Sequence, residues 1–286
     1  MKIKKPWMAC WPGLLLAVLL LVGGTAWSEP APLRLGILPY NSTLALMKTH
    51  QPLRQFLQNR LGRPVEIFTA ADYQSFLREQ LLGNYDLMIT PPHFAVMALD
   101  KGYLPLVHYQ ARLEPILALR KDDPTVDLKG MQGRRIAMAN RIAFATIVGL
   151  KVLGDNGLKP DRDFVVVERP THGAAIAAVA VGDADGAITT TTLLGQVPED
   201  ILHNVRFISF GIRLPHVVTM GHKRLGDAEL KRIKEALLTF AGSAEGRAFF
   251  KETSYLGYEE LSPDELLLFK PYVAPLKQLL GPGFPQ

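Results

Sequence analysis

The chain has 286 residues, of which 48% are hydrophobic and 21% are charged. This composition is typical of globular proteins and excludes a largely disordered chain. The formal net charge is +5, but no cluster of Lys and Arg is interleaved with aromatic residues, so nothing in the sequence indicates nucleic-acid binding.

The first 28 residues have the pattern of an export signal. Three lysines precede an uncharged apolar run at 14–22, and the triplet at 26–28 suits a signal peptidase. We predict that residues 1–28 are a cleavable signal peptide that directs the chain to the periplasm. An uncleaved membrane anchor is the alternative, although the run is shorter than the ~20 residues of a spanning helix.

The mature chain is nearly neutral and has no thiol. The leader contributes three of the 32 Lys and Arg, which leaves 29 against 27 Asp and Glu. The single cysteine, Cys10, precedes the apolar run and is therefore not a lipoprotein cysteine. Export without disulfides fits a bacterial periplasm, where the fold depends on its hydrophobic core.

Strand and helix patterns alternate in the first third of the mature chain. Short apolar runs predict strands, and amphipathic segments with capping residues predict the helices between them. One helix is expected after Thr43, and Pro52 is expected at the first position of a second helix. The other predicted elements are strands Leu33–Leu38, Val65–Thr69 and Tyr85–Thr90 and helices that start at Asp72 and His93.

A second alternating set follows two apolar runs, Leu104–Tyr109 and Pro115–Arg120, which we expect to form an antiparallel or crossing pair. The sequence 121–124 is the expected boundary between two lobes, and a second crossing is expected at 211–221. The second set comprises the strands Arg135–Ala139, Phe164–Glu168, Asp185–Thr189 and Arg206–Phe210 and the helices Ala143–Leu153 and His172–Val181. We predict a first lobe of residues 29–120 and 213–286 and a second lobe of residues 121–212.

Ligands of open α/β sheets bind beyond the carboxyl ends of the strands, where helix N-termini present unpaired N–H groups. The candidate ligand-binding residues therefore come from loops that follow strands or from helix starts. In the first lobe they are Tyr40, Asn41, Ser42, Thr90, His93 and Phe94, and in the second lobe they are Asn140, Arg141, Thr146, His172 and Thr190.

Five sequence segments, in this order and spacing, resemble the periplasmic phosphate/phosphite/phosphonate-binding protein family. These are Leu35–Tyr40 (LGILPY), Gln51–Val65, Tyr85–Pro91, Leu128–Ala137 and Val181–Ala187 (VGDADGA). The resemblance covers essentially the whole mature chain. It implies an α/β, type II periplasmic-binding-protein clamshell with two hinge crossings, in which each lobe is a mixed, mostly parallel sheet flanked by helices.

The resemblance also implies a receptor that binds a small anionic solute and delivers it to an ABC permease, without catalysis. Family members place a hydroxyl-rich run at a helix start of the second lobe, but here Ala143, Phe144 and Ala145 precede the only hydroxyl, Thr146. We therefore expect Arg141 to clamp the anion in place of the missing hydroxyls. Phe144 is expected to favour a ligand with an organic portion over phosphate.

Other functions remain open at this stage. The same clamshell could serve a membrane histidine kinase or diguanylate cyclase as a sensory receptor. His93, His172 and His216 could form a three-nitrogen zinc site, but their spacing has no metal signature, and we expect neither metal nor cofactor. The mature chain has no cysteine or Gly-x-Ser-x-Gly motif for an enzyme. A monomer is expected.

Overall fold

The computed structural model describes residues 1–3 and 31–285. The predicted signal peptide, residues 1–28, falls almost wholly outside these residues. Residues 32–286 form one compact unit, to which all elements below belong. In the described part of the chain, no helix combines the length and apolarity that crossing a bilayer requires.

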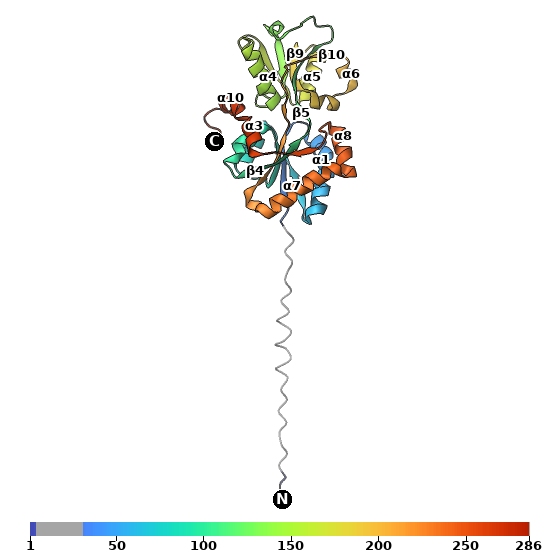
Figure 1. The fold of residues 1–286 in the computed structure, drawn as a ribbon, viewed down its shortest axis with the longest axis vertical. Coiled ribbons are helices and arrows are strands. Elements are labelled where there is room, and N and C mark those ends of the chain that lie inside the picture. The colour runs from blue at the N-terminus through green and yellow to red at the C-terminus, as the bar shows by residue number, and fades with distance from the viewer. Residues whose placement is uncertain (4–30, 286) are drawn as a thin grey trace. The chain divides into compact units, whose positions relative to one another are not determined.

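The first lobe is built on a six-stranded sheet in the order β13-β4-β12-β3-β1-β2 (Figure 1). Its strands β1, β2 and β3 are parallel to one another, whereas β12 pairs antiparallel with β3 and β4. The strands are β1 Leu33–Ile37, β2 Val65–Phe68, β3 Leu87–Thr90, β4 Tyr103–Tyr109, β12 Val218–His222 and β13 Tyr258–Glu260. The helices are α1 Thr43–Leu61, α2 Tyr73–Leu81, α3 Pro92–Leu99, α7 Asp227–Gly242, α8 Ala244–Thr253, α9 Pro263–Leu267 and α10 Val273–Leu280.

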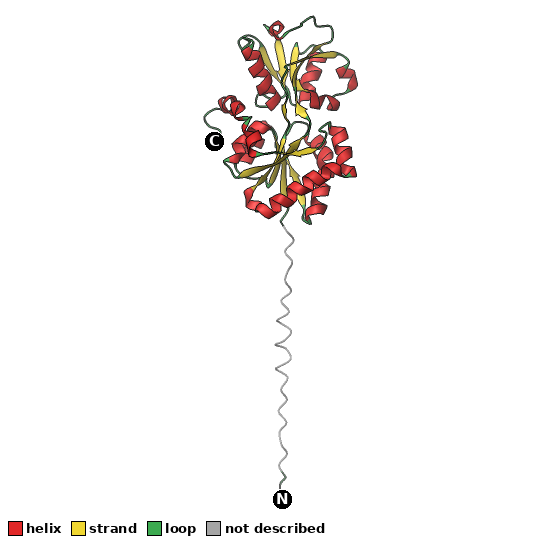
Figure 2. Cartoon of the chain, in the orientation of Figure 1, coloured by secondary structure: helices red, strands yellow, loops and turns green. Residues whose placement is uncertain are grey.

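The second lobe is built on a five-stranded sheet in the order β10-β6-β9-β7-β8, with helices on both faces (Figure 2). Here β7, β8 and β9 are parallel, and β6 and β10 are antiparallel. The strands are β6 Pro115–Arg120, β7 Arg135–Met138, β8 Val165–Glu168, β9 Gly186–Thr190 and β10 Val205–Ser209. The helical segments are α4 Phe144–Asp155, α5 His172–Ala180, α6 Glu199–Leu202 and the 3-10 helix η2 Thr191–Gln196.

The two-sheet α/β fold agrees with the prediction, but the sheets are less parallel than expected. Each sheet has three neighbouring parallel strands. Antiparallel strands extend this group from one side, beginning with β12 next to β3 in the first sheet and β6 next to β9 in the second. The crossings are the short strands β5 (Arg112–Leu113) and β11 (Leu214–Pro215), which pair with each other. In Figure 1, β5 lies where the chain passes from one sheet to the other.

One detail of the predicted chain path is wrong. Leu104–Tyr109 and Pro115–Arg120 form the crossing alternative and not an antiparallel pair, since β4 lies in the first sheet and β6 in the second. The first crossing therefore precedes residue 115 rather than following residue 120, because β6 completes the hydrogen bonding of β9 and β10.

Pro52 does not begin a helix but lies within the single helix α1. The buried side chains Leu46, Leu53, Leu57 and Leu61 share one face of α1 and pack against the first sheet and the helices α7 and α8. Burial of this continuous stripe outweighs the loss of one backbone hydrogen bond at Pro52.

Candidate functional site

Two cavities lie where the lobes meet. The larger, of about 290 Å³, is called here the α5 cavity, and the smaller, of about 50 Å³, the central cavity. Tyr40, His172 and Leu193 line both. The two cavities are therefore adjacent and form one candidate site.

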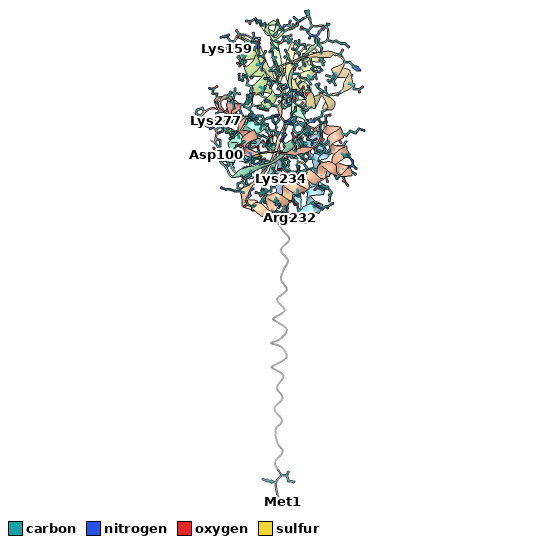
Figure 3. All side chains as sticks on the ribbon, viewed as in Figure 1. Met1, Asp100, Lys159, Arg232, Lys234 and Lys277 are labelled. Atoms are coloured by element: carbon teal, nitrogen blue, oxygen red, sulfur yellow. The ribbon has the colours of Figure 1, made fainter. Side chains whose placement is uncertain are left out.

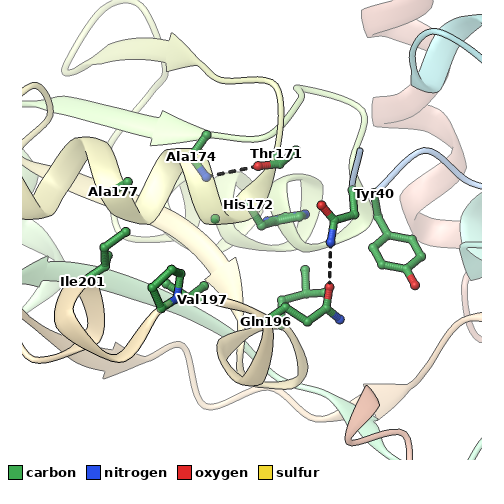
Figure 4. A pocket seen from close by; sticks show the side chains of 12 residues that line it. Tyr40, Thr171, His172, Ala174, Ala177, Gln196, Val197 and Ile201 are labelled. Carbon is green, nitrogen blue, oxygen red and sulfur yellow. Dashed lines mark hydrogen bonds between the residues drawn. The ribbon is translucent and has the colours of Figure 1, made fainter. Parts of the chain in front are cut away.

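The first lobe contributes Tyr40 and Asn41, from the loop between β1 and α1, to the α5 cavity. The amide of Asn41 donates a hydrogen bond to Oε1 of Gln196 in the second lobe, at 3.1 Å (Figure 4). This bond connects the lobes across the cavity. The neighbouring Ser42 is exposed and caps α1, since its hydroxyl accepts a hydrogen bond from the N–H of Ala45 at 3.3 Å.

The second lobe contributes the start of α5. Thr171 is the N-cap, and its Oγ1 accepts a hydrogen bond from the N–H of Ala174 at 3.1 Å. The N–H groups of His172 and Gly173 belong to the first turn and have no acceptor within the helix. They line the α5 cavity at the positive end of the helix dipole, where an anion is stabilised.

His172 lies between the two cavities and is only 5% exposed. Figure 4 shows its ring extending from the start of α5 toward the side of the cavity where Tyr40 lies. Burial lowers its pKa to about 4, although a backbone interaction with Ile188 acts in the opposite direction. Nδ1 of this neutral ring has no hydrogen-bond partner in the described protein.

The central cavity combines neutral hydrogen-bonding groups with apolar walls. Nε2 of His216 lies 2.9 Å from Oγ1 of Thr192, and the His216 Nδ1 has no partner among the described residues. The polar lining consists of Tyr40, Tyr73, Tyr255, Thr190, Thr192, His172 and His216. The apolar lining consists of Leu38, Pro91, Leu113, Ala143, Phe144, Ala145, Leu193 and Val217.

The ionisable groups of the central cavity are uncharged at neutral pH. Burial lowers the pKa of His216 to about 3. Burial, followed by the nearby Tyr255, raises the pKa of Tyr40 well above its ordinary value. Burial likewise raises the pKa of Tyr255. The phenols therefore stay protonated and can donate hydrogen bonds to a ligand.

None of the described residues that line either cavity is Lys, Arg, Asp or Glu. Charged side chains such as Asp100, Lys159 and Lys277 are exposed on the outside of the protein (Figure 3). A ligand in these cavities would meet dipoles and hydrogen-bond donors rather than a formal counter-charge.

The start of α4 also follows a parallel strand. Its residues Ala143, Phe144 and Ala145 border the central cavity, and the rest of this helix start is covered by apolar packing. The ring of Phe144 stacks on His93 at a centroid distance of 4.9 Å and contacts Phe269 and Tyr272 edge-on at 5.5 and 5.1 Å. His93 is fully buried, and its Nε2 lies 2.9 Å from the carbonyl oxygen of Ile142. These contacts connect the second lobe to α3 and to the C-terminal helices of the first.

Arg141 lies outside both cavity linings and does not supply the expected clamp. Its guanidinium donates two hydrogen bonds to Asp161, at 2.7 and 3.1 Å, and a third to Glu168 at 3.2 Å. The hydrogen bonds with Asp161 are the main reason why the pKa of Arg141 is raised. Asn140 shapes the same loop, because its Oδ1 accepts a hydrogen bond from the N–H of Ile142 at 3.0 Å.

Of the predicted ligand-binding residues, the structure brings Tyr40, Asn41, His172 and Thr190 into the cavity linings. Thr90 and Phe94 are instead buried in the first lobe, where Gln80 binds the hydroxyl of Thr90 and the carbonyl of Phe94. Thr146 is fully buried and outside both linings. The residues outside the linings are Ser42, Thr90, His93, Phe94, Asn140, Arg141 and Thr146.

Sequence reasoning missed Thr171, Gln196, Tyr73 and Tyr255. Thr171 could have been found as an N-cap directly before His172. Tyr255 follows α8 and returns to the site from the far end of the chain, and no local pattern marks it. Among the described residues, no group of three or more His, Cys, Asp or Glu is placed to hold a metal ion.

Comparisons with known proteins agree with this architecture. Residues 35–266 match the family model described as "ABC transporter, phosphonate, periplasmic substrate-binding protein".

Solved structures share the fold at low sequence identity. PhnD1 from Prochlorococcus marinus, in complex with methylphosphonate, is 13% identical with a TM-score of 0.75 and matches 87% of this chain and 99% of its own. The binding protein of an ABC phosphonate transporter from Pseudomonas aeruginosa is 15% identical with a TM-score of 0.74, and the match covers 88% of this chain and 89% of that protein. XAC2383 from Xanthomonas citri, bound to ATP, is 17% identical with a TM-score of 0.71, and the match covers 87% of this chain and 98% of that protein. The chain belongs to the phosphonate family of periplasmic substrate-binding proteins of ABC transporters.

Proposed function

We propose that this protein binds a small organic oxyanion, such as a phosphonate, between its lobes and delivers it to an inner-membrane ABC permease. The observation that carries the proposal is the start of α5, which faces Tyr40 and Asn41 across the α5 cavity. The backbone N–H groups of His172 and Gly173 are donors from which anionic oxygens can accept hydrogen bonds.

Binding would favour the closed arrangement of the lobes. The oxyanion contacts α5 in the second lobe and Tyr40 in the first, so its affinity is highest when both lobes surround it. The hydrogen bond between Asn41 and Gln196 forms only when the lobes approach, and it closes the rim of the α5 cavity. The permease would then recognise the closed form.

The same proposal covers the remaining properties of the chain. We propose a monomer that is exported by cleavage of residues 1–28 and that carries out no chemical reaction. The described residues of the cavity linings include no carboxylate, thiol or lysine.

The proposal is tested by native mass spectrometry of freshly purified protein, to detect a retained ligand, and then by a thermal-shift panel of phosphonates, sulfonates, phosphate and carboxylates. A bound oxyanion raises the melting temperature, because ligand binding stabilises only the folded state. We expect stabilisation by organic phosphonates or sulfonates. Phosphate binding more tightly than every organic anion, or no stabilisation by any oxyanion, would contradict the proposal.

A further inference from the structure

The two cavities together can hold one molecule with two chemically different ends. Tyr40, His172 and Leu193 border both, so a ligand at the start of α5 can extend directly into the central cavity. This inference rests on the proposed function and concerns the charge and the substituent of the ligand.

The charge that the site can hold is small. No described lining residue has a formal charge, and one helix N-terminus corresponds to only about half an elementary charge. A second negative charge on the ligand would lose its hydration without gaining a cation, which is costly in a buried site. The lining therefore disfavours dianions.

Two buried imidazole nitrogens without a partner belong to residues that line the central cavity. Nδ1 of His172 and Nδ1 of His216 have no partner among the described residues, and both rings border the central cavity. His172 is 5% exposed and His216 is 3% exposed. Buried polar atoms in native proteins are normally hydrogen-bonded, and a neutral imidazole can donate or accept according to its tautomer.

The central cavity limits the other end of the ligand. Leu38, Leu113, Phe144 and Val217 form apolar walls around about 50 Å³. By the 10–15 Å³ that each water-sized sphere needs, this volume holds only about three to five such spheres. It suits a small apolar substituent and excludes a long or charged one.

We infer that the preferred ligand is a singly charged organic oxyanion, whose oxygens bind the start of α5 and whose small apolar substituent occupies the central cavity. A sulfonate and the monoester of a phosphonate both belong to this class. Their shared chemistry, rather than the identity of the central atom, determines recognition.

The test is isothermal titration calorimetry with three ligands of similar shape, at a pH at which methylphosphonate is a dianion. Methanesulfonate and the monomethyl ester of methylphosphonate are monoanions. We expect both to bind at least about tenfold more tightly than methylphosphonate, a difference of about 1.4 kcal/mol. Equal or tighter binding of the dianion would overturn the inference while leaving the proposed function intact. If none of the three binds, the proposed function itself fails.

A pair of variants tests the charge argument within the protein. Gln196 lines the α5 cavity and is partly exposed, so Gln196→Lys would place an ammonium beside the ligand. We expect Gln196→Lys to improve binding of methylphosphonate more than that of methanesulfonate, whereas Gln196→Met, which has no charge, leaves the ratio unchanged. Melting temperatures of both variants report on folding. An unchanged ratio in folded Gln196→Lys would contradict the inference.

Discussion

The starts of α4 and α5 have the same backbone setting and different surroundings. Both helices follow parallel strands of one sheet, and both N-cap residues are extended. Helix α4 begins with Ala143 and Phe144, without a side-chain cap, and is covered by the first lobe. Helix α5 begins with Thr171, His172 and Gly173 and faces a cavity of about 290 Å³. A helix dipole creates a potential anion site, but the side chains around it determine whether a ligand can reach it.

The largest effect is expected from shortening Phe144 at the start of α4. Phe144 is 3% exposed and contacts His93, Phe269 and Tyr272, so Phe144→Ala should lower the free energy of unfolding by about 3 kcal/mol or more. Urea denaturation of the ligand-free protein measures this loss. Phe144→Leu, which keeps most of the volume, is the control and should lose much less. A loss below ~1 kcal/mol for Phe144→Ala would mean that the apolar closure contributes little.

The second prediction isolates one backbone donor at the start of α5. Proline is accepted at the first helical position, and the preceding Thr171 has the extended backbone (φ −141°, ψ 164°) that proline requires. His172→Ala removes the imidazole, whereas His172→Pro also removes the N–H. We expect His172→Pro to bind the oxyanion more weakly than His172→Ala by about 1.5–3 kcal/mol, the range for a hydrogen bond to a charged group.

Calorimetric titration of both His172 variants measures this difference, and their melting temperatures control for folding. Equal affinities in the two variants would remove the N–H of residue 172 from the site.

The third prediction concerns the pH dependence of stability that is caused by His93, which packs against the start of α4. Burial lowers the pKa of His93 to about 3, below the 6.5 of an exposed histidine, so the unfolded chain binds a proton more readily than the folded one. Stability is therefore full above about pH 6.5 and falls as the pH decreases toward the folded pKa, by about 2 kcal/mol for this residue at pH 5. His93→Gln retains a donor for the Ile142 carbonyl and does not titrate.

Urea denaturation at pH 7 and pH 5 checks the role of His93. We expect His93→Gln to lose less stability between these two pH values than the wild-type protein. The same loss in both proteins would show that His93 does not titrate in this range.

The smallest effect is expected at Arg141, which sequence analysis placed in the site. Its ion pairs with Asp161 and Glu168 are partly exposed, so Arg141→Ala should reduce stability by no more than about 1 kcal/mol and leave ligand affinity unchanged. Titration of Arg141→Ala and of the control Arg141→Lys measures this. A tenfold loss of ligand affinity in Arg141→Ala would show that the guanidinium takes part in ligand binding.

Local sequence patterns predicted the features of the fold that depend on residues close together in the sequence. The alternation of strands and helices is confirmed, because hydrophobic periodicity acts within one element. Tyr40 was proposed from the end of a strand and His172 from a helix start; both lie in the cavity linings, and their contact with a ligand stays a prediction.

Long-range packing could not be predicted from such patterns. Arg141 was assigned to the ligand because hydroxyls are missing at the start of α4. Its partner in the structure is Asp161, which lies in a separate loop, 20 residues further along the chain. Phe144 lines the central cavity as expected, but its contacts with Phe269 and Tyr272 of the C-terminal segment were not anticipated. Which residues such a side chain contacts depends on tertiary packing, including the way in which the two lobes meet.

The central claim is that the oxyanion binds at the start of α5 and not at the start of α4. The most direct test is an NMR titration of the 15N-labelled protein with methylphosphonate, comparing the backbone amides of His172 and Gly173 with those of Phe144 and Ala145. We predict the largest downfield proton shifts at His172 and Gly173, since their N–H groups donate to the anion. Large shifts at Phe144 and Ala145, with α5 unchanged, would contradict the account.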